Sequence, residues 1–229
     1  MMDAVIQATA ARFVRLLKTR HATVTVAESC TGGLLASTFT DIAGASAWFK
    51  KSWVTYANEA KVEELNVSPE DLKTRGAVSA QVAIQMAKGA LAKANATFAI
   101  SVTGIAGPTN EGSSKPIGTV YVGIATDTWA NAIHTQIGGT RSENKRGFVH
   151  FALLTALRCF DEAMEREAQK VVEEHEAMIE AARLEALAQA EREEREQKAR
   201  EEAPWQDEAW SEEQEEDAIL EVEWSDGEE

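Results

Sequence analysis

Short apolar runs rich in β-branched residues alternate with amphipathic segments through residues 1–160. The runs at 23–27, 97–102 and 119–126 have the composition of strands in a covered sheet, and weaker strand patterns occur at 52–56 and 133–137. Helical periodicity occupies residues 4–18, 31–42, 58–65, 79–94 and 142–160. This alternation predicts an α/β fold, and we expect a three-layer α/β/α domain with a mixed sheet over residues 1–160.

The composition changes abruptly after Phe160. Residues 161–203 are almost entirely helix-favouring types, and Pro204 ends this charged helical extension. A short seam of mostly apolar residues recurs in it at heptad-like spacing: Met164, Ala168, Val171, His175, Met178 and Ala182. The extension is therefore either a coiled coil or a single helix held by charged pairs such as Glu191–Arg195. Residues 204–229 are acidic, contain three tryptophans and have the composition of a disordered tail.

The net charge of −15 is distributed unevenly along the chain. Residues 1–160 hold 16 Lys and Arg against 11 Asp and Glu, a net charge of +5, whereas residues 161–229 hold 7 against 27, a net charge of −20. Because such an acidic segment repels phosphate, direct nucleic-acid binding is not expected of it. We expect residues 161–229 to bind a basic protein partner, and the heptad pattern also predicts a homo-oligomer.

Several absences narrow the class of protein. No apolar run approaches the roughly 20 residues of a membrane span, and the N-terminus lacks a basic segment followed by an apolar one. Cys30 and Cys159 lie far apart, which predicts two free thiols in a reducing cytoplasm. The four histidines are scattered and no Cys-x-x-Cys occurs, so no metal site is expected. These features predict a cytoplasmic protein without a membrane anchor.

Polar and glycine residues gather in turns that follow predicted strands. The first is AESCTGG (27–33), in which Ser29 and Thr31 supply hydroxyls at the start of a helix. Helix N-termini favour anions, and Gly32 and Gly33 allow a ligand to approach the backbone closely. Glu28 is expected to act as an acid or to hold the turn by accepting backbone N–H bonds. This turn is our first candidate for a ligand site.

Two further turns, SVTGIAGP (101–108) and GGTR (138–141), have similar composition. They contribute Thr103, Gly104, Gly107 and Arg141, whose guanidinium can fork onto a phosphate or carboxylate. Ligands of open α/β sheets bind beyond the carboxyl ends of strands, so we expect one polar, anion-accepting pocket there. The string VTYANEAK (54–61) adds Tyr56 and Lys61, and a buried lysine can activate a hydroxyl.

With GAVS (76–79) and KPIGTVYVG (115–123), these strings resemble the CinA C-terminal domain, the nicotinamide-nucleotide amidohydrolase family, over about residues 5–160. The resemblance implies hydrolysis of nicotinamide mononucleotide, a small nucleotide substrate, to nicotinate mononucleotide and ammonia, with no cofactor. It implies Ser29 as nucleophile or substrate-binding hydroxyl, Lys61 as base, and Tyr56, Thr103 and Arg141 as partners of the substrate. N–H groups of residues 31–33 or 104–107 would hold the oxyanion.

Three stretches depart from the family pattern: Lys50–Trp53 lacks a glycine, 109–112 lacks the Asp-Gly-Gly loop, and Gly139-Thr140-Arg141 replaces Gly-Asp-Arg. We therefore carry two hypotheses of function. In the first the chain is an active amidohydrolase with an acidic C-terminal interaction module. In the second it is a non-catalytic interaction protein that reuses this fold and binds a basic or nucleic-acid-processing protein through residues 161–229.

Overall fold

The computed structural model describes residues 2–110 and 112–202. The chain divides into two compact units, Met1–Val171 and Val172–Glu229. Along the chain the elements are α1 (Met2–Thr19), β1 (Val24–Glu28), α2 (Leu34–Thr40), the 3-10 turn η1 (Ala45–Ala47), β2 (Phe49–Val54), α3 (Asn58–Leu65), α4 (Pro69–Arg75), α5 (Ala80–Ala94), β3 (Phe98–Gly104), β4 (Thr119–Ala125), β5 (Ala130–Gln136) and α6 (Arg141–Glu202).

The five strands form one sheet in the order β2-β1-β3-β4-β5. β1 pairs in parallel with both β2 and β3, whereas β4 runs antiparallel to β3 and β5. This arrangement confirms the predicted mixed sheet. Because β1 and β3 are parallel neighbours, the turns that follow them meet at one edge of the sheet.

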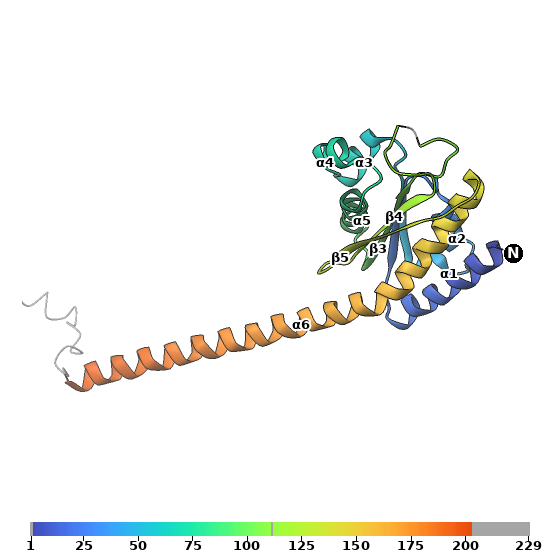
Figure 1. Ribbon diagram of the computed structural model, residues 1–229. Coiled ribbons are helices and arrows are strands. Elements are labelled where there is room, and N and C mark those ends of the chain that lie inside the picture. The colour runs from blue at the N-terminus through green and yellow to red at the C-terminus, as the bar shows by residue number, and fades with distance from the viewer. Residues whose placement is uncertain (1, 111, 203–229) are drawn as a thin grey trace, which may run out of the picture. The chain divides into compact units, whose positions relative to one another are not determined.

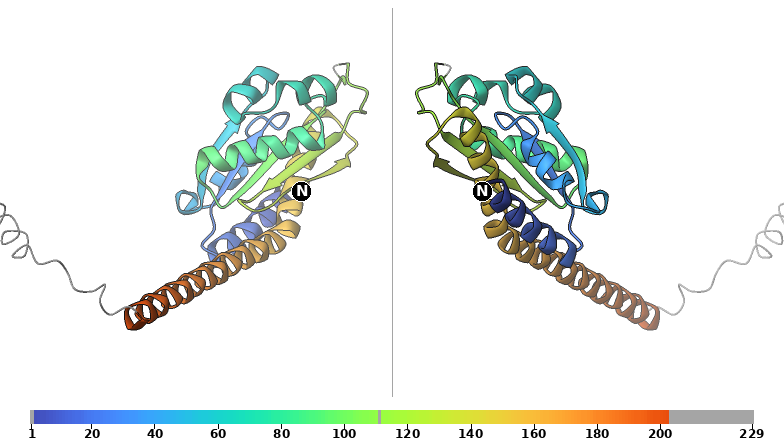
Figure 2. Two further views of the ribbon diagram at one scale, coloured as in Figure 1. Left: turned by 90° about the vertical axis from the view of Figure 1, so that its left-hand side faces the viewer. Right: turned by 90° about the vertical axis from the view of Figure 1, so that its right-hand side faces the viewer.

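Helices cover both faces of the sheet, as Figures 1 and 2 show. On one face α1, α2 and the first part of α6 pack on alternate strand residues, including Val24, Val26 and Ile100, around the aromatic cluster of Phe13, Phe98 and Phe160. On the other face α3, α4 and α5 pack together through residues such as Leu65, Leu72 and Met86. The period-2 alternation of the strands thus produces the three predicted layers.

The two predicted C-terminal helical segments form a single helix, α6. The first compact unit extends past residue 160 because Ala163 is fully buried and Met164 packs on the same core. From residue 171 to residue 202 every described side chain is exposed. Intrahelical pairs occur there, including Glu191–Arg195 at 3.6 Å. The predicted acidic tail, 204–229, lies outside the described residues.

Three elements differ from the sequence-based expectation. β2 lies at Phe49–Val54, displaced toward the N-terminus from the predicted 52–56, and β5 begins at Ala130 where the prediction began at residue 133. The helix α4 was not predicted. Within residues 2–110 and 112–202, no helix is both long and apolar enough to cross a membrane.

Candidate active site

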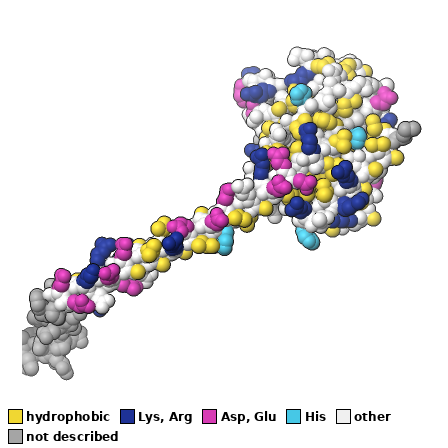
Figure 3. All heavy atoms as spheres, turned by 60° about the horizontal axis from the view of Figure 1, so that its bottom comes forward, with side chains coloured by type: hydrophobic (Ala, Val, Ile, Leu, Met, Phe, Trp, Pro, Cys, Tyr) yellow, Lys and Arg dark blue, Asp and Glu magenta, His cyan; other side chains and the backbone are white. Residues whose placement is uncertain are grey.

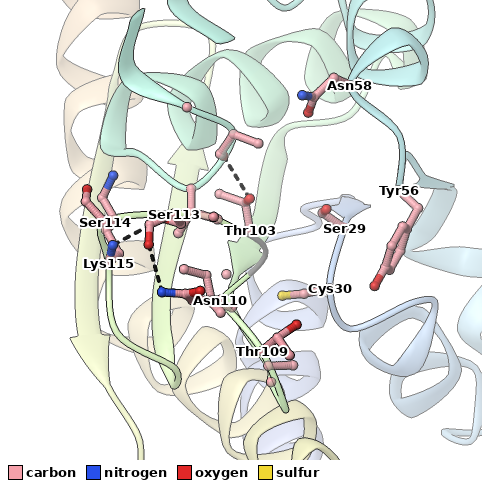
Figure 4. A pocket seen from close by; sticks show the side chains of 18 of the residues that line it. Ser29, Cys30, Tyr56, Asn58, Thr103, Thr109, Asn110, Ser113, Ser114 and Lys115 are labelled. Atoms are coloured by element: carbon pink, nitrogen blue, oxygen red, sulfur yellow. Dashed lines mark hydrogen bonds between the residues drawn. The ribbon is translucent and has the colours of Figure 1, made fainter. Parts of the chain in front are cut away.

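A cavity of about 480 Å³ lies where the turns after β1, β2 and β3 meet. Ser29 and Cys30 come from the first turn, and Tyr56 and Lys61 come from the second turn and the helix α3 after it. Thr103 ends β3, and Arg141 begins α6. In the view of Figure 4, Ser29, Cys30 and Thr103 stand between Tyr56 and the 109–115 loop. The cavity therefore gathers residues from four of the predicted motifs.

Ser29 is held rigidly at the end of a fully buried strand. Its backbone N–H donates to Val102 O at 2.9 Å, which ties the turn after β1 to β3, and the residue is 9% exposed. Cys30 beside it is a free thiol, as is Cys159, and both are buried. Burial raises the pKa of the Cys30 thiol to about 12. The thiolate is therefore disfavoured, which leaves the Ser29 hydroxyl as the better placed nucleophile.

Glu28 occupies the helix start that the sequence suggested as an anion site. Its buried carboxylate accepts hydrogen bonds from the backbone N–H groups of Gly33, Leu35 and Ala36 at 3.0, 3.1 and 2.8 Å. These are donors that a helix cannot satisfy internally, so the side chain caps α2 and complements its dipole. The hydrogen bonds confirm the structural reading of Glu28. Thr31, Gly32 and Gly33 do not line the cavity.

Lys61 is a buried lysine whose ammonium faces main-chain carbonyls. Its side chain is almost completely buried, and Nζ donates to the carbonyl oxygens of Thr55 at 2.8 Å and Tyr56 at 3.0 Å. Burial lowers its pKa from 10.5 to about 8, and the charges of Cys30 and Glu59 oppose the shift. At that pKa a usable fraction of the amine is neutral near physiological pH, as a general base requires.

Arg141 bridges two walls of the cavity. One guanidinium nitrogen donates to the Tyr56 hydroxyl at 2.7 Å and another donates to the carbonyl oxygen of Gly107. Tyr56 is 53% exposed, so the bond from Arg141 fixes the orientation of a phenol that the surrounding protein leaves largely open. A guanidinium has five N–H donors, so donors remain for an anionic ligand.

The turn after β3 supplies free backbone donors. Thr103 Oγ1 donates to Ala77 O at 2.9 Å, which ties β3 to the residues before α5. Gly104 has no room for a side chain, because a Cβ there would lie 2.7 Å from the carbonyl oxygen of Thr119. Among the described residues, the N–H groups of Ala106 and Gly107 have no protein acceptor, and both residues line the cavity. These two donors are free to receive an oxyanion.

Thr140 explains one departure from the family pattern. Its backbone N–H and its hydroxyl donate to Glu143 Oε2 at 2.8 and 2.7 Å, and the Glu143 N–H returns a bond to Thr140 Oγ1 at 3.4 Å. This is a capping box at the start of α6, the helix that carries Arg141. Asp and Thr both serve as N-cap residues, so replacing Asp by Thr preserves this helix start.

The structure thus brings seven of the ten predicted residues into one cavity: Ser29, Tyr56, Lys61, Thr103, Gly104, Gly107 and Arg141. It also adds two wall segments that the sequence reasoning did not select, residues 74–78 and the loop around 109–115, together with Asn58. Asn58 lies two residues after Tyr56 in the string VTYANEAK (54–61). This position in a predicted site motif could have identified it as a residue of the cavity. Residues 76–78 belong to the string GAVS (76–79), which forms part of the resemblance to the CinA family. Among the described residues, no cluster of His, Cys, Asp and Glu is arranged to hold a metal ion.

The model of the CinA C-terminal domain matches residues 6–160. The chain belongs to the CinA C-terminal domain family. Its sequence is 46% identical over 149 residues to the nicotinamide-nucleotide amidohydrolase PncC of Shigella flexneri, covering 63% of this chain and 88% of that protein. It is 47% identical over 145 residues to a CinA-like protein of Desulfosudis oleivorans, covering 63% of this chain.

Solved CinA structures have the same fold. The competence/damage-inducible protein from Agrobacterium tumefaciens matches with a TM-score of 0.63 and 40% identity, covering 67% of this chain and 94% of that one. A CinA superfamily protein from Klebsiella pneumoniae matches with a TM-score of 0.67 and 30% identity, covering 69% and 98%. The chain spans about a third of the length of longer relatives, such as the 35% covered of the D. oleivorans protein. The family match ends at residue 160.

Proposed function

We propose that this chain hydrolyses the carboxamide of nicotinamide mononucleotide, giving nicotinate mononucleotide and ammonia. The observation that carries the proposal is the presence of Ser29 and a buried Lys61 of lowered pKa in one cavity. The relatives named nicotinamide-nucleotide amidohydrolase support the choice of substrate, because they share this part of the chain at 46% identity.

In the proposed mechanism the neutral amine of Lys61 accepts the Ser29 proton while Ser29 Oγ bonds to the carboxamide carbon. The carbonyl oxygen becomes an oxyanion, which the N–H groups of Ala106 and Gly107 stabilise. When the tetrahedral intermediate collapses, the C–N bond breaks, and the ammonium of Lys61 returns the proton to the departing nitrogen, which leaves as ammonia. Water then hydrolyses the Ser29 ester, again with Lys61 as base, and regenerates the hydroxyl.

Arg141 has two tasks in this proposal. It positions the Tyr56 phenol through the 2.7 Å bond, and its remaining N–H groups bind the substrate phosphate. Thr103 is a wall of the pocket, although its hydroxyl is already donated to Ala77 O. Thr31, Gly32 and Gly33 do not line the cavity, so the proposal gives them no direct contact with substrate.

The test is release of ammonia from nicotinamide mononucleotide by the full chain. We expect turnover that Ser29→Ala and Lys61→Met each reduce by roughly 10³-fold or more, as removal of an activated nucleophile or its base does. Matched controls remove the same groups from the surface: Ser37→Ala on α2 and Lys93→Met on α5 should leave the rate unchanged.

The rate of the unmodified chain should rise with pH through about pH 8, the pKa of Lys61. Absence of turnover by the unmodified chain at high enzyme concentration would contradict the proposal. It would leave the second hypothesis, a non-catalytic protein that reuses the fold.

A further inference from the structure

The second unit of the chain carries a row of mainly apolar side chains, with one histidine among them, that nothing in the described residues covers. On α6 the residues Val172, His175, Met178, Ile179, Ala182 and Ala186 recur at intervals of three and four, so they share one side of the helix. We call this set the α6 stripe. The side chains of Val172, Met178 and Ile179 are 54%, 63% and 54% exposed.

The α6 stripe is a localised feature of the helix. Between residues 189 and 202 the interactions are intrahelical polar pairs, including Glu191–Arg195 at 3.6 Å and Glu194–Lys198 at 2.9 Å. Such pairs can support a helix without any partner. By contrast, large exposed side chains at residues 172–179 leave apolar area in water, at a cost of about 25 cal/mol per Å². This exposed apolar area would be covered if another helix packed on it.

The charged residues beside the α6 stripe determine which kind of partner can bind it. Residues 172–187 contain five glutamates and one basic residue, Arg183, which pairs with Glu180 at 3.7 Å. At 3.6 residues per turn, Glu176 and Glu180 fall on one side of the stripe and Glu174 and Glu185 on the other. Figure 3 shows acidic side chains beside hydrophobic ones along the visible face of α6. Both borders are therefore negative.

We propose that the α6 stripe binds an amphipathic helix of a partner protein whose own apolar stripe is bordered by Lys or Arg. Apolar residues of the two helices pack against each other, and the partner's cations face the glutamates on both borders. A second copy of this chain would bring glutamates against glutamates. Nucleic acids and anionic lipid surfaces are repelled for the same reason. The surface lies beyond residue 160, where the family match ends.

The probe is a synthetic amphipathic peptide of about 20 residues with a Leu stripe bordered by Lys, long enough to form a helix. Its binding to the full chain is followed by fluorescence anisotropy. The comparison peptides replace every Lys by Glu, or every Leu by Ser. We expect only the first peptide to bind well, because it alone has both the apolar stripe and the matching charge.

Two double variants separate the stripe from general acidity. Val172→Glu/Ile179→Glu places two carboxylates on the α6 stripe. Ala177→Glu/Leu184→Glu introduces two glutamates at the same seven-residue spacing. This second pair lies about 140° around the helix axis from Val172 and Ile179, away from the α6 stripe. Both variants add the same negative charge and keep a residue with high helix propensity. Ammonia release from nicotinamide mononucleotide and far-UV circular dichroism should be the same for both.

We expect the stripe variant to bind the Leu/Lys peptide about tenfold more weakly or worse, even though it is more acidic, because apolar anchors dominate such interfaces. The control variant should bind as well as the unmodified chain. Equal binding by both variants, or no binding at all, would overturn the proposal. So would sedimentation showing that the unmodified chain self-associates through the stripe, with the association lost only in Val172→Glu/Ile179→Glu.

Discussion

The buried ammonium of Lys61 makes the stability of the fold depend on pH in a calculable way. Its pKa is about 8 in the folded chain against an ordinary 10.5, so between these values the unfolded chain binds more protons. The free energy of unfolding therefore rises with pH between about 8 and 10.5. Below this window the buried charge of Lys61 destabilises the fold fully, and above it the lysine is neutral in both states and has no such effect. The whole window corresponds to about 3 kcal/mol, of which about 1 kcal/mol falls between roughly pH 7 and pH 9.

The perturbation is Lys61→Met, which removes the titrating group and keeps a side chain of similar length. We expect the unmodified chain to gain about 1 kcal/mol in unfolding free energy relative to Lys61→Met between about pH 7 and pH 9. Urea unfolding at several pH values, followed by tryptophan fluorescence, measures this. Trp48 is 2% exposed and reports on the core. All other titrating groups are common to both chains, so their contributions cancel in the difference except for the interaction of Cys30 with Lys61.

Lys93→Met is the matched control, because the ammonium of Lys93 also donates to a backbone carbonyl, Glu63 O at 3.1 Å, but on the surface. This variant should follow the unmodified chain at every pH. Parallel curves for the unmodified chain and Lys61→Met would refute the reasoning, since Lys61 would then keep its ordinary pKa. Its role as a base near neutral pH would lose its physical basis, whatever the activity of the variant.

Four further outcomes follow from the site. Glu28→Ala should lower the unfolding free energy by about 3 kcal/mol or more in urea titrations, because it orphans three N–H groups, whereas Glu28→Gln should cost less. Arg141→Lys should not restore the kcat/KM lost in Arg141→Met, since one ammonium cannot replace the planar fork that reaches both Tyr56 and Gly107. Gly104→Ala should lower the Tm, because its Cβ would lie 2.7 Å from a carbonyl oxygen. Cys30 should resist thiol reagents at neutral pH in the folded chain, because burial raises its pKa to about 12, and rapid labelling would contradict its burial.

The order of layers was predictable because strand and helix periodicities differ strongly in this chain. At the start of α5, Ser79 Oγ accepts from the Val82 N–H at 3.4 Å, as serine commonly does before the first turn of a helix. α4 was missed although its signals are present: Ser68 as N-cap, Pro69 in the first turn, and Lys73 and Arg75 in the last turn. β2 was misplaced because it is an edge strand with a largely exposed pattern, so no alternation marked its start.

The site was predictable as a set of turns, but the task of each residue was not. Hydroxyl and glycine residues at strand ends indicated a pocket, and parallel pairing of β1 and β3 brings those turns together. An N–H group can bind an anion only if no other group of the protein already accepts its hydrogen bond. Which N–H groups are free depends on tertiary contacts, and the sequence alone does not reveal them. Glu28 takes the donors of Gly33, Leu35 and Ala36, so a turn that looked like an anion site is filled from within the chain.

Glu28 and Lys61 show how one small site holds two opposite buried charges without pairing them. The carboxylate is solvated by backbone N–H groups of α2, and the ammonium by the backbone carbonyls of Thr55 and Tyr56. A direct ion pair would favour the charged form of Lys61 and raise its pKa. The main chain therefore partners each group separately, and burial is left as the main influence on Lys61, which lowers its pKa to about 8.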